Sequence, residues 1–295
     1  MRITHRMLIS NAVENMEASM ARLADLNSKY ASGKKIQAPS DDPAVAVAGL
    51  SARSGIRNCE NYIDLANTTG NWLDANDVAL GQVIDEVTRA LVLSETGVSD
   101  TVGEEERTTL SEELNSILNE IIEIGNTQHE GDYLFAGFLT QTRPFELVSG
   151  TPDTVSYSGD TGVIQRAVSP GQLITVNIDG DAAFNPVFDA IIRGRDALAA
   201  NNKTEIGAAI TDLQNAIESV KIVRTNNGSR KRQVNNTIDR LTDTKSDMET
   251  LLSQKEDINM AEVISDLQYQ EVVYQSVLES GKMALNLPTL FSFLG

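Results

Sequence analysis

Two short groups of residues could carry chemistry by their type and spacing. Asp41 and Asp42 are adjacent carboxylates that could hold a cation, and His129-Glu130-Gly131-Asp132 could serve a metal or an acid–base reaction. Ions such as Mg²⁺ need several oxygen ligands, and the sequence offers no further set of ligands to complete a site with either group. Asp42 before Pro43 is instead typical of a helix N-cap, and Gly131 is typical of a turn. We therefore expect no metal, no cofactor and no catalytic residue.

The remaining reactive or charged groups favour structural roles. Cys59 is the only cysteine, which excludes an internal disulfide, and it falls inside a helical stretch as a small packing residue. His5 and His129 are too far apart in the sequence to suggest a shared site. Arg230-Lys231-Arg232 is basic, but the chain carries a net charge of −18, so we expect this helix face to pair with carboxylates and not with nucleic acid. The chain has no 18-residue apolar run, so we expect no membrane insertion, and its start lacks the apolar core of a cleavable secretory signal.

Apolar residues recur in steps of four and three at both ends of the chain, which predicts two helical seams. We expect the seams to pack on each other as an antiparallel pair. The first seam consists of Ile9, Val13, Met16, Met20, Leu23, Asn27 and Tyr30. The second consists of Met260, Ile264, Leu267, Glu271, Tyr274, Leu278, Gly281 and Leu285.

The C-terminal segment carries a second apolar strip on another side of the same helix: Ile258, Ala261, Tyr269, Val272 and Val273. One partner helix can cover only one strip. The second strip needs lipid, burial inside a larger domain, or another protein chain. We favour another chain, because no comparably apolar segment remains. The predicted assembly interface therefore comprises the apolar seam residues Ile9, Val13, Met16, Met20, Leu23, Tyr30, Met260, Ile264, Leu267, Tyr274 and Leu278, and the strip residues Ile258, Tyr269, Val272 and Val273.

The segments between the two seams read as helices interrupted by a β-rich stretch. Apolar periodicity predicts helices over about 44–96 and 104–124, a helix that begins at Pro186, and a long helix after an Asn202 cap that continues through Asn226-Asn227-Gly228. A short strand is expected at 133–135. Alternation and turn residues predict strands at 145–148, 154–157, 164–168 and 173–178. The predicted fold class is mainly α, with long antiparallel helical rods or coiled coil from the N- and C-terminal regions and a small β-rich insert domain.

Four stretches of the chain resemble one family. They are Met1-Arg2-Ile3 leading into a helix that ends Ala31-Ser32-Gly33-Lys34-Lys35-Ile36; Pro39-Ser40-Asp41-Asp42-Pro43; Gly131-Asp132-Tyr133-Leu134-Phe135-Ala136-Gly137 with Tyr157-Ser158-Gly159-Asp160; and the end Leu290-Phe291-Ser292-Phe293-Leu294-Gly295. The chain resembles the flagellin-like hook–filament junction proteins, the flagellar hook-associated protein 3 family. Proline and serine near Asp41 distinguish it from bulk flagellin. Lys34 beside Lys35 and the final Gly295 depart from the family pattern.

The resemblance implies a structural component of the bacterial flagellum that is not an enzyme. It implies unfolded export through the type III apparatus with an export chaperone, and extracellular assembly as a ring of about eleven copies between hook-associated protein 1 and flagellin. It implies terminal segments that fold only on assembly. Residues 1–43 and 255–295 would form an inner helical domain, 44–139 (with a short hairpin) and 186–254 a helical rod domain, and 140–185 the outer insert.

Two other functions remain open from the sequence. The chain could be the flagellin that forms the filament itself, which copy number per flagellum would separate from a junction protein. It could instead be a secreted adhesin or surface enzyme that uses the β insert, which binding of residues 140–185 to cells or glycans would favour.

Overall fold

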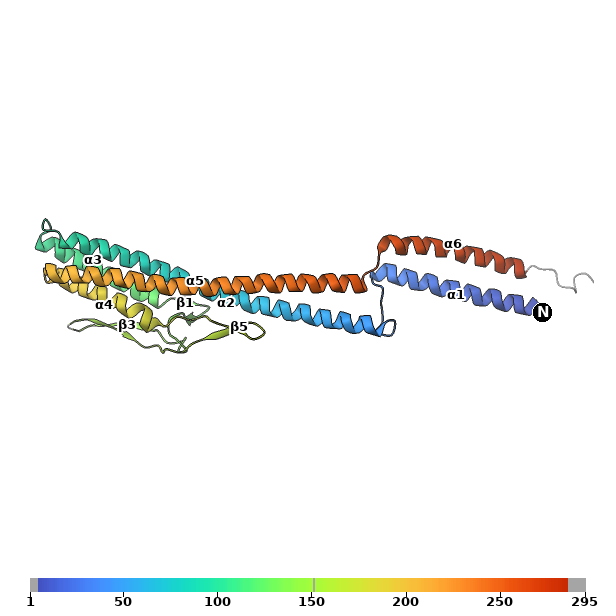
Figure 1. Cartoon of the computed structure of the whole chain (residues 1–295), viewed down its shortest axis with the longest axis horizontal. Helices are drawn as coiled ribbons and strands as arrows, with labels where there is room; N and C mark the ends of the chain where they lie inside the picture. Colours follow the sequence, from blue (N-terminus) through green and yellow to red (C-terminus); the bar gives the residue numbers. More distant parts are fainter. Residues whose placement is uncertain (1–4, 151, 286–295) are drawn as a thin grey trace, which may run out of the picture. The chain divides into compact units, whose positions relative to one another are not determined.

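The computed structural model describes residues 5–150 and 152–285, with side chains from 7 to 283, and it confirms a mainly helical chain with small antiparallel strand pairs. The chain divides into two compact units. We call Met1–Asn58 with Thr244–Gly295 the terminal unit, and Cys59–Asp243 the central unit. Helices α1 (His5–Ser32) and α6 (Met260–Leu285) belong to the terminal unit (Figure 1). Helices α2 (Pro43–Val98) and α5 (Lys203–Glu256) contribute to both units.

Helix α2 begins where the sequence predicts a cap. The Asp42 Oδ1 atom accepts hydrogen bonds from the backbone N–H groups of Ala44 at 3.0 Å and Val45 at 3.1 Å. Asp41 accepts from the N–H groups of Ala38 and Gln37, and these bonds lower the pKa of its carboxyl below the ordinary value. Both carboxylates therefore shape the chain before α2, with Pro43 as the first helical residue, and the predicted cap is confirmed.

Helix α5 runs without a break through Asn226-Asn227-Gly228, as predicted. Polar residues at three inward positions bond to α2 within the central unit. Arg224 makes two hydrogen bonds of 2.9 Å to the Asp77 carboxylate, and Lys231 lies 2.6 Å from Asp74. The buried Asn227 amide donates to the Leu73 carbonyl oxygen at 2.7 Å. Polar contacts inside a helix seam cost some stability but fix the register of the two helices.

The β-rich stretch forms two hairpins at the predicted places. Strand β3 (Phe145–Val148) pairs with β4 (Thr154–Tyr157), and β5 (Gln165–Ser169) pairs with β6 (Gln172–Thr175). A third, smaller hairpin joins β1 (Gln128–His129) to β2 (Asp132–Tyr133). Its turn residues Glu130 and Gly131 have φ values of 55° and 91°, which a two-residue hairpin turn requires. The strand expected at 133–135 is therefore wrong except at Tyr133, because β2 ends there and residues 134–135 form a turn.

Helix α4 (Gly180–Ala199) begins six residues before Pro186, the predicted start. The Asp179 carboxylate accepts from the Ala182 N–H at 3.3 Å and caps the helix. Pro186 then lies inside the helix, where it cannot donate a backbone hydrogen bond and its ring crowds the carbonyl four residues before it. Apolar residues 183 and 184 already face the core, so burial favours the earlier start. Helix α3 (Glu104–Gly125) packs beside α4 (Figure 1).

The insert shares its core with the helices of the central unit. Phe145 of β3 is fully buried, and its ring centroid lies 5.1 Å from that of Phe184 and 5.2 Å from that of Phe188, both on α4. The Asn126 side chain at the end of α3 bonds both backbone groups of Phe145, at 2.9 and 3.0 Å. The hairpin β3–β4 is therefore anchored to α3 and α4 and does not form a separate core.

Candidate assembly surface

Helices α1 and α6 pack side by side as an antiparallel pair (Figure 1). At the centre of their contact, Gln270 Nε2 donates to Ser19 Oγ at 2.9 Å, and both residues are buried. The half-buried residues on either side of this contact show which faces meet. On α1 they are Ile9, Ala12, Met16, Leu23 and Leu26; on α6 they are Val263, Leu267, Val273, Tyr274, Val277 and Leu278.

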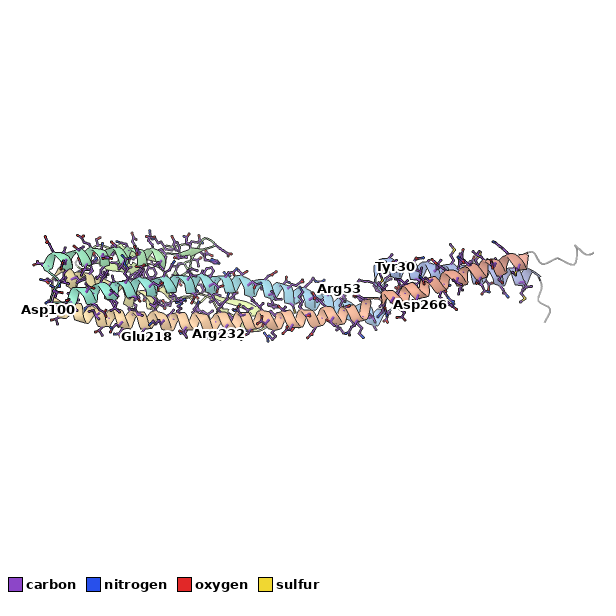
Figure 2. The ribbon with its side chains drawn as sticks, turned by 90° about the horizontal axis from the view of Figure 1, so that it is seen from above. Tyr30, Arg53, Asp100, Glu218, Arg232 and Asp266 are labelled. Atoms are coloured by element: carbon purple, nitrogen blue, oxygen red, sulfur yellow. The ribbon has the colours of Figure 1, made fainter. Side chains whose placement is uncertain are left out.

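This seam differs in phase from the predicted one on α1. Ala12, Ser19 and Leu26 occupy the positions that the heptad assigned to Val13, Met20 and Asn27. Of the predicted interface residues, Ile9, Met16, Leu23, Leu267, Tyr274, Leu278, Ile258 and Val273 are half-buried. The other seven, Val13, Met20, Tyr30, Met260, Ile264, Tyr269 and Val272, are exposed. Figure 2 shows the side chains of the pair, with Tyr30 and Asp266 labelled. Leu285 and the motifs at 1–3 and 290–295 lie outside the residues whose side chains are described.

The α1–α6 pair buries almost nothing by itself. Among the side chains described for 7–32 and 260–283, only Ser19 and Gln270 are buried, and no apolar residue is. Exposed apolar side chains include Tyr269 at 70 % and Val272 at 60 %. The central unit, in contrast, fully buries large side chains such as Leu80, Leu118 and Phe135. A monomeric protein seldom leaves so large a share of its apolar residues uncovered, so the α1–α6 pair is a candidate surface for protein contacts.

A buried carboxylate fixes the chain between α1 and α2 onto the end of α5. Glu256 accepts from the Lys34 ammonium at 2.8 Å and from the Arg53 guanidinium. The backbone N–H of Lys35 donates to the Glu256 carbonyl at 2.6 Å, and the N–H of Ile258 donates to the Gly33 carbonyl at 3.1 Å. Beside this contact lies a groove of about 510 Å³, whose lining includes Ile36, Pro39, Val47, Leu50 and Arg53.

The residue groups that could do chemistry hold structural positions. Asp41 and Asp42 bond backbone N–H groups, as described above. His129 packs edge-on against Trp72, with ring centroids 5.7 Å apart, and the Arg166 guanidinium lies over the Trp72 ring, 5.0 Å from its centroid. Cys59 is buried. Within 5–150 and 152–285, no three His, Cys, Asp or Glu side chains are placed to hold a metal ion, and no helix there has the length and hydropathy to span a membrane.

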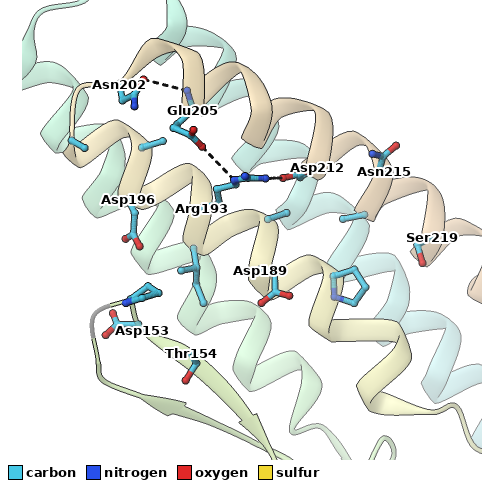
Figure 3. Close-up of a pocket in the computed structure, with 17 residues that line it drawn as sticks. Asp153, Thr154, Asp189, Arg193, Asp196, Asn202, Glu205, Asp212, Asn215 and Ser219 are labelled. Atoms are coloured by element: carbon cyan, nitrogen blue, oxygen red, sulfur yellow. Dashed lines mark hydrogen bonds and ion pairs between the residues drawn. The ribbon is translucent and has the colours of Figure 1, made fainter.

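A cavity of about 890 Å³ lies between β4, α4 and the start of α5 (Figure 3). Arg193 lies between two carboxylates that line it, 3.5 Å from Glu205 and 2.5 Å from Asp212. These neighbours raise the pKa of the Arg193 guanidinium. The Asn202 side chain, which accepts from the Glu205 N–H, caps α5 at the rim. Two other lining carboxylates, Asp153 and Asp196, pair with Arg195. The lining residues include no histidine, and no nucleophile–base pair among them carries a proposal for catalysis.

One carboxyl in the central unit opposes folding at neutral pH. Partial burial and the nearby Glu120 carboxylate raise the pKa of Glu86. A carboxyl whose pKa is raised in the folded state costs stability once pH exceeds the folded pKa, and this cost disappears below the unfolded pKa. We expect Glu86→Gln to stabilise the chain by a few tenths of a kcal/mol at pH 7, because the site is partly solvated. In urea titrations the gain should vanish as pH falls towards 4, whereas a gain that persists at pH 4 would contradict this origin.

Comparisons with known proteins give one consistent result. Residues 3–140 match the model of the bacterial flagellin N-terminal helical region. Flagellar hook-associated protein 3 of Salmonella typhimurium is 24 % identical over 94 % of this chain and 94 % of its own length. The protein of the same name from Escherichia coli is 21 % identical over 68 % of this chain and 62 % of its own length.

Solved structures agree on the fold. The crystal structure of the flagellar junction protein FlgL from Legionella pneumophila superimposes with a TM-score of 0.62 at 15 % identity. It is matched over 100 % of its length and covers 72 % of this chain. The chain therefore resembles flagellar hook-associated protein 3 in sequence and shares the fold of the Legionella pneumophila junction protein.

Proposed function

We propose that this chain is a structural subunit of the extracellular bacterial flagellum, that it joins the hook to the filament, and that it has no enzymatic activity. Its similarity to flagellar hook-associated protein 3 over nearly the whole length supports the location. The observation that carries the proposal is the α1–α6 pair, whose described side chains include no buried apolar residue. Such a pair is complete only when neighbouring chains cover it.

The mechanism is assembly by helix burial. Full burial of one Val, Leu or Tyr side chain stabilises a contact by roughly 1.5–3 kcal/mol. Several such side chains per subunit outweigh the repulsion between acidic chains, which salt screens at the surface. The exposed apolar faces lie on different sides of α1 and α6, so one face of a subunit would contact a different face of the next. Such head-to-tail contacts close into a ring when the rotation between subunits allows it. We propose a ring of about eleven copies, as the family resemblance implies.

The proposed partners follow from this position. One side of the ring would contact hook-associated protein 1 and the other would contact flagellin. Before assembly, the chain would be held by an export chaperone and passed through the type III export apparatus. No part of this role requires a cofactor, nucleic acid or membrane insertion.

A location experiment separates this function from that of a filament protein, which the match to the flagellin N-terminal region also allows. Purified flagella are labelled with gold-conjugated antibody against the central unit and imaged by electron microscopy. We expect label only at the hook–filament boundary. Label along the filament would identify a flagellin, and label absent from flagella would reject both readings.

A further inference from the structure

Two faces of the terminal unit carry complementary patterns of charged and apolar side chains, most of which are exposed. The first is on the opening turns of α2, beside the 510 Å³ groove: Val47, Leu50, Arg53 and Arg57. The second is on α6: Glu262, Asp266, Tyr269 and Val272. In each set the steps of three and four place the four residues on one side of the helix. We call them the α2 face and the α6 face.

The α2 face is apolar and basic. Val47 and Leu50 are 69 % and 64 % exposed, although they border a groove already lined by Ile36 and Pro39. Arg53 bonds Glu256 yet keeps 42 % of its side chain exposed, and Arg57 is exposed. Residues 29–57 contain five basic and two acidic side chains, a net charge of +3 in a chain of −18. Three of these basic side chains already have carboxylate partners, since Lys29 pairs with Asp25, and Lys34 and Arg53 pair with Glu256. Exposed Arg57, with the exposed part of Arg53, is therefore the part of this face that can attract an acidic surface.

The α6 face is apolar and acidic. Tyr269 and Val272 are exposed, and so are Glu262 and Asp266. Helix α6 contains four acidic residues and one lysine, a net charge of −3. The Ser19–Gln270 contact holds a neighbouring side of α6 on α1, and Tyr269 and Val272 stay exposed beside it.

The order of residues on the two faces matches in antiparallel alignment. Along α2 the apolar residues come first and the basic ones follow, whereas along α6 the acidic residues precede the apolar ones. One register pairs Val47 with Val272, Leu50 with Tyr269, Arg53 with Asp266, and Arg57 with Glu262. Each face runs over eleven residues, and the ten steps between its ends span about 15 Å of helix. Figure 2 labels Arg53 and Asp266, the third of these pairs.

We propose that the α6 face of one copy docks antiparallel on the α2 face of a second copy in this register. The apolar pairs supply the affinity, and the two ion pairs set the direction and exclude a reversed helix. The inference rests on the proposed function, because it names which surfaces meet when copies assemble. The occupant of the groove is a second copy of this chain, since its own α6 supplies the matching charge and spacing.

Cysteine cross-linking in assembled flagella tests the register. Cells that lack the native gene co-produce two full-length chains, Val47→Cys and Val272→Cys, each with Cys59→Ser. Facing cysteines form a disulfide only when their Cα atoms approach within about 7 Å. We expect mild oxidation to give a dimer of this chain. The matched control replaces Val47→Cys by Val92→Cys, which is also exposed on α2 but lies outside the groove, and should give none.

A charge exchange provides a second readout that does not depend on the cysteine variants. Arg57→Glu or Glu262→Arg alone should reduce the number of intact junctions per cell about tenfold, and the double variant should restore it. No 47–272 dimer and no rescue would overturn the docking, as would a cross-link to another flagellar protein. If gold label still marks the junction in that case, only this inference fails; if the label is elsewhere, the proposed function fails.

Discussion

Replacing Tyr269 and Val272 together by aspartate is expected to abolish junction assembly while the monomer stays folded. The two side chains are exposed on α6, so their loss removes no contact within the chain. Burial of both side chains in an assembled flagellum would together stabilise the contact between two subunits by about 3–6 kcal/mol. Loss of this burial would weaken binding between the subunits by about 10²- to 10⁴-fold. The measurements are swimming in soft agar, flagellar filament count by electron microscopy, and circular dichroism of the purified chain.

The choice of exposed residues makes this variant specific. Leu267 and Leu278 lie half-buried in the α1–α6 seam, so a charge there would disturb the pair itself as well as any contact between copies. The matched control is Val78→Asp, a 61 % exposed residue on α2 in the central unit, which should leave assembly intact. Normal filaments with the Tyr269–Val272 double variant would show that this face of α6 is not an interface.

The Phe145→Ala variant is expected to destabilise the central unit by about 3–5 kcal/mol. Phe145 is fully buried against Phe184, Phe188 and Tyr157, and the cavity left behind cannot collapse easily because Asn126 holds its backbone from both sides. Urea unfolding, followed through the fluorescence of Trp72, would measure the loss. This single tryptophan is buried in the same core and reports on it.

The control for this core variant is Phe138→Ala. Phe138 is 62 % exposed, so its truncation should change the free energy of unfolding by less than about 1 kcal/mol. A loss below about 1 kcal/mol for Phe145→Ala would mean that the β3–β4 hairpin is not anchored to α3 and α4. A large loss would lead us to expect that deletion of the insert also damages the helical core.

Patterns local in the sequence predicted most of the fold. The helices over α2, α3 and α5 and the two hairpins of the insert follow from apolar periodicity and from turns at glycine and proline, which act within a few residues. The Asp42 cap follows from one dipeptide. The start of α4 was missed because Pro186 reads as a first helical residue, whereas the Asp179 cap and burial of Phe184 favour an earlier turn.

Contacts that depend on the tertiary arrangement could not be predicted. Ala12 and Ser19 face α6, although Val13 and Met20 are more apolar. The apolar side of α1 is wider than one partner helix can cover, so the sequence pattern cannot predict which part of it the partner covers. The buried Arg107 was also missed. It donates to the carbonyls of Gly97 and Ser99, at 2.7 and 2.8 Å, and to the Asn201 side chain, and only the fold brings these acceptors together.

The polar centre of the α1–α6 seam has a consequence for how the chain opens. A pair held by one Ser19–Gln270 contact and half-buried residues must separate at a low free-energy cost, whereas the aromatic core around Phe145 opens only with the whole central unit. Amide protons of α1 and α6 should therefore exchange with solvent deuterium long before those of α3 and α4. With such a gradient of local unfolding, α1 and α6 can lose their structure while the central unit stays folded.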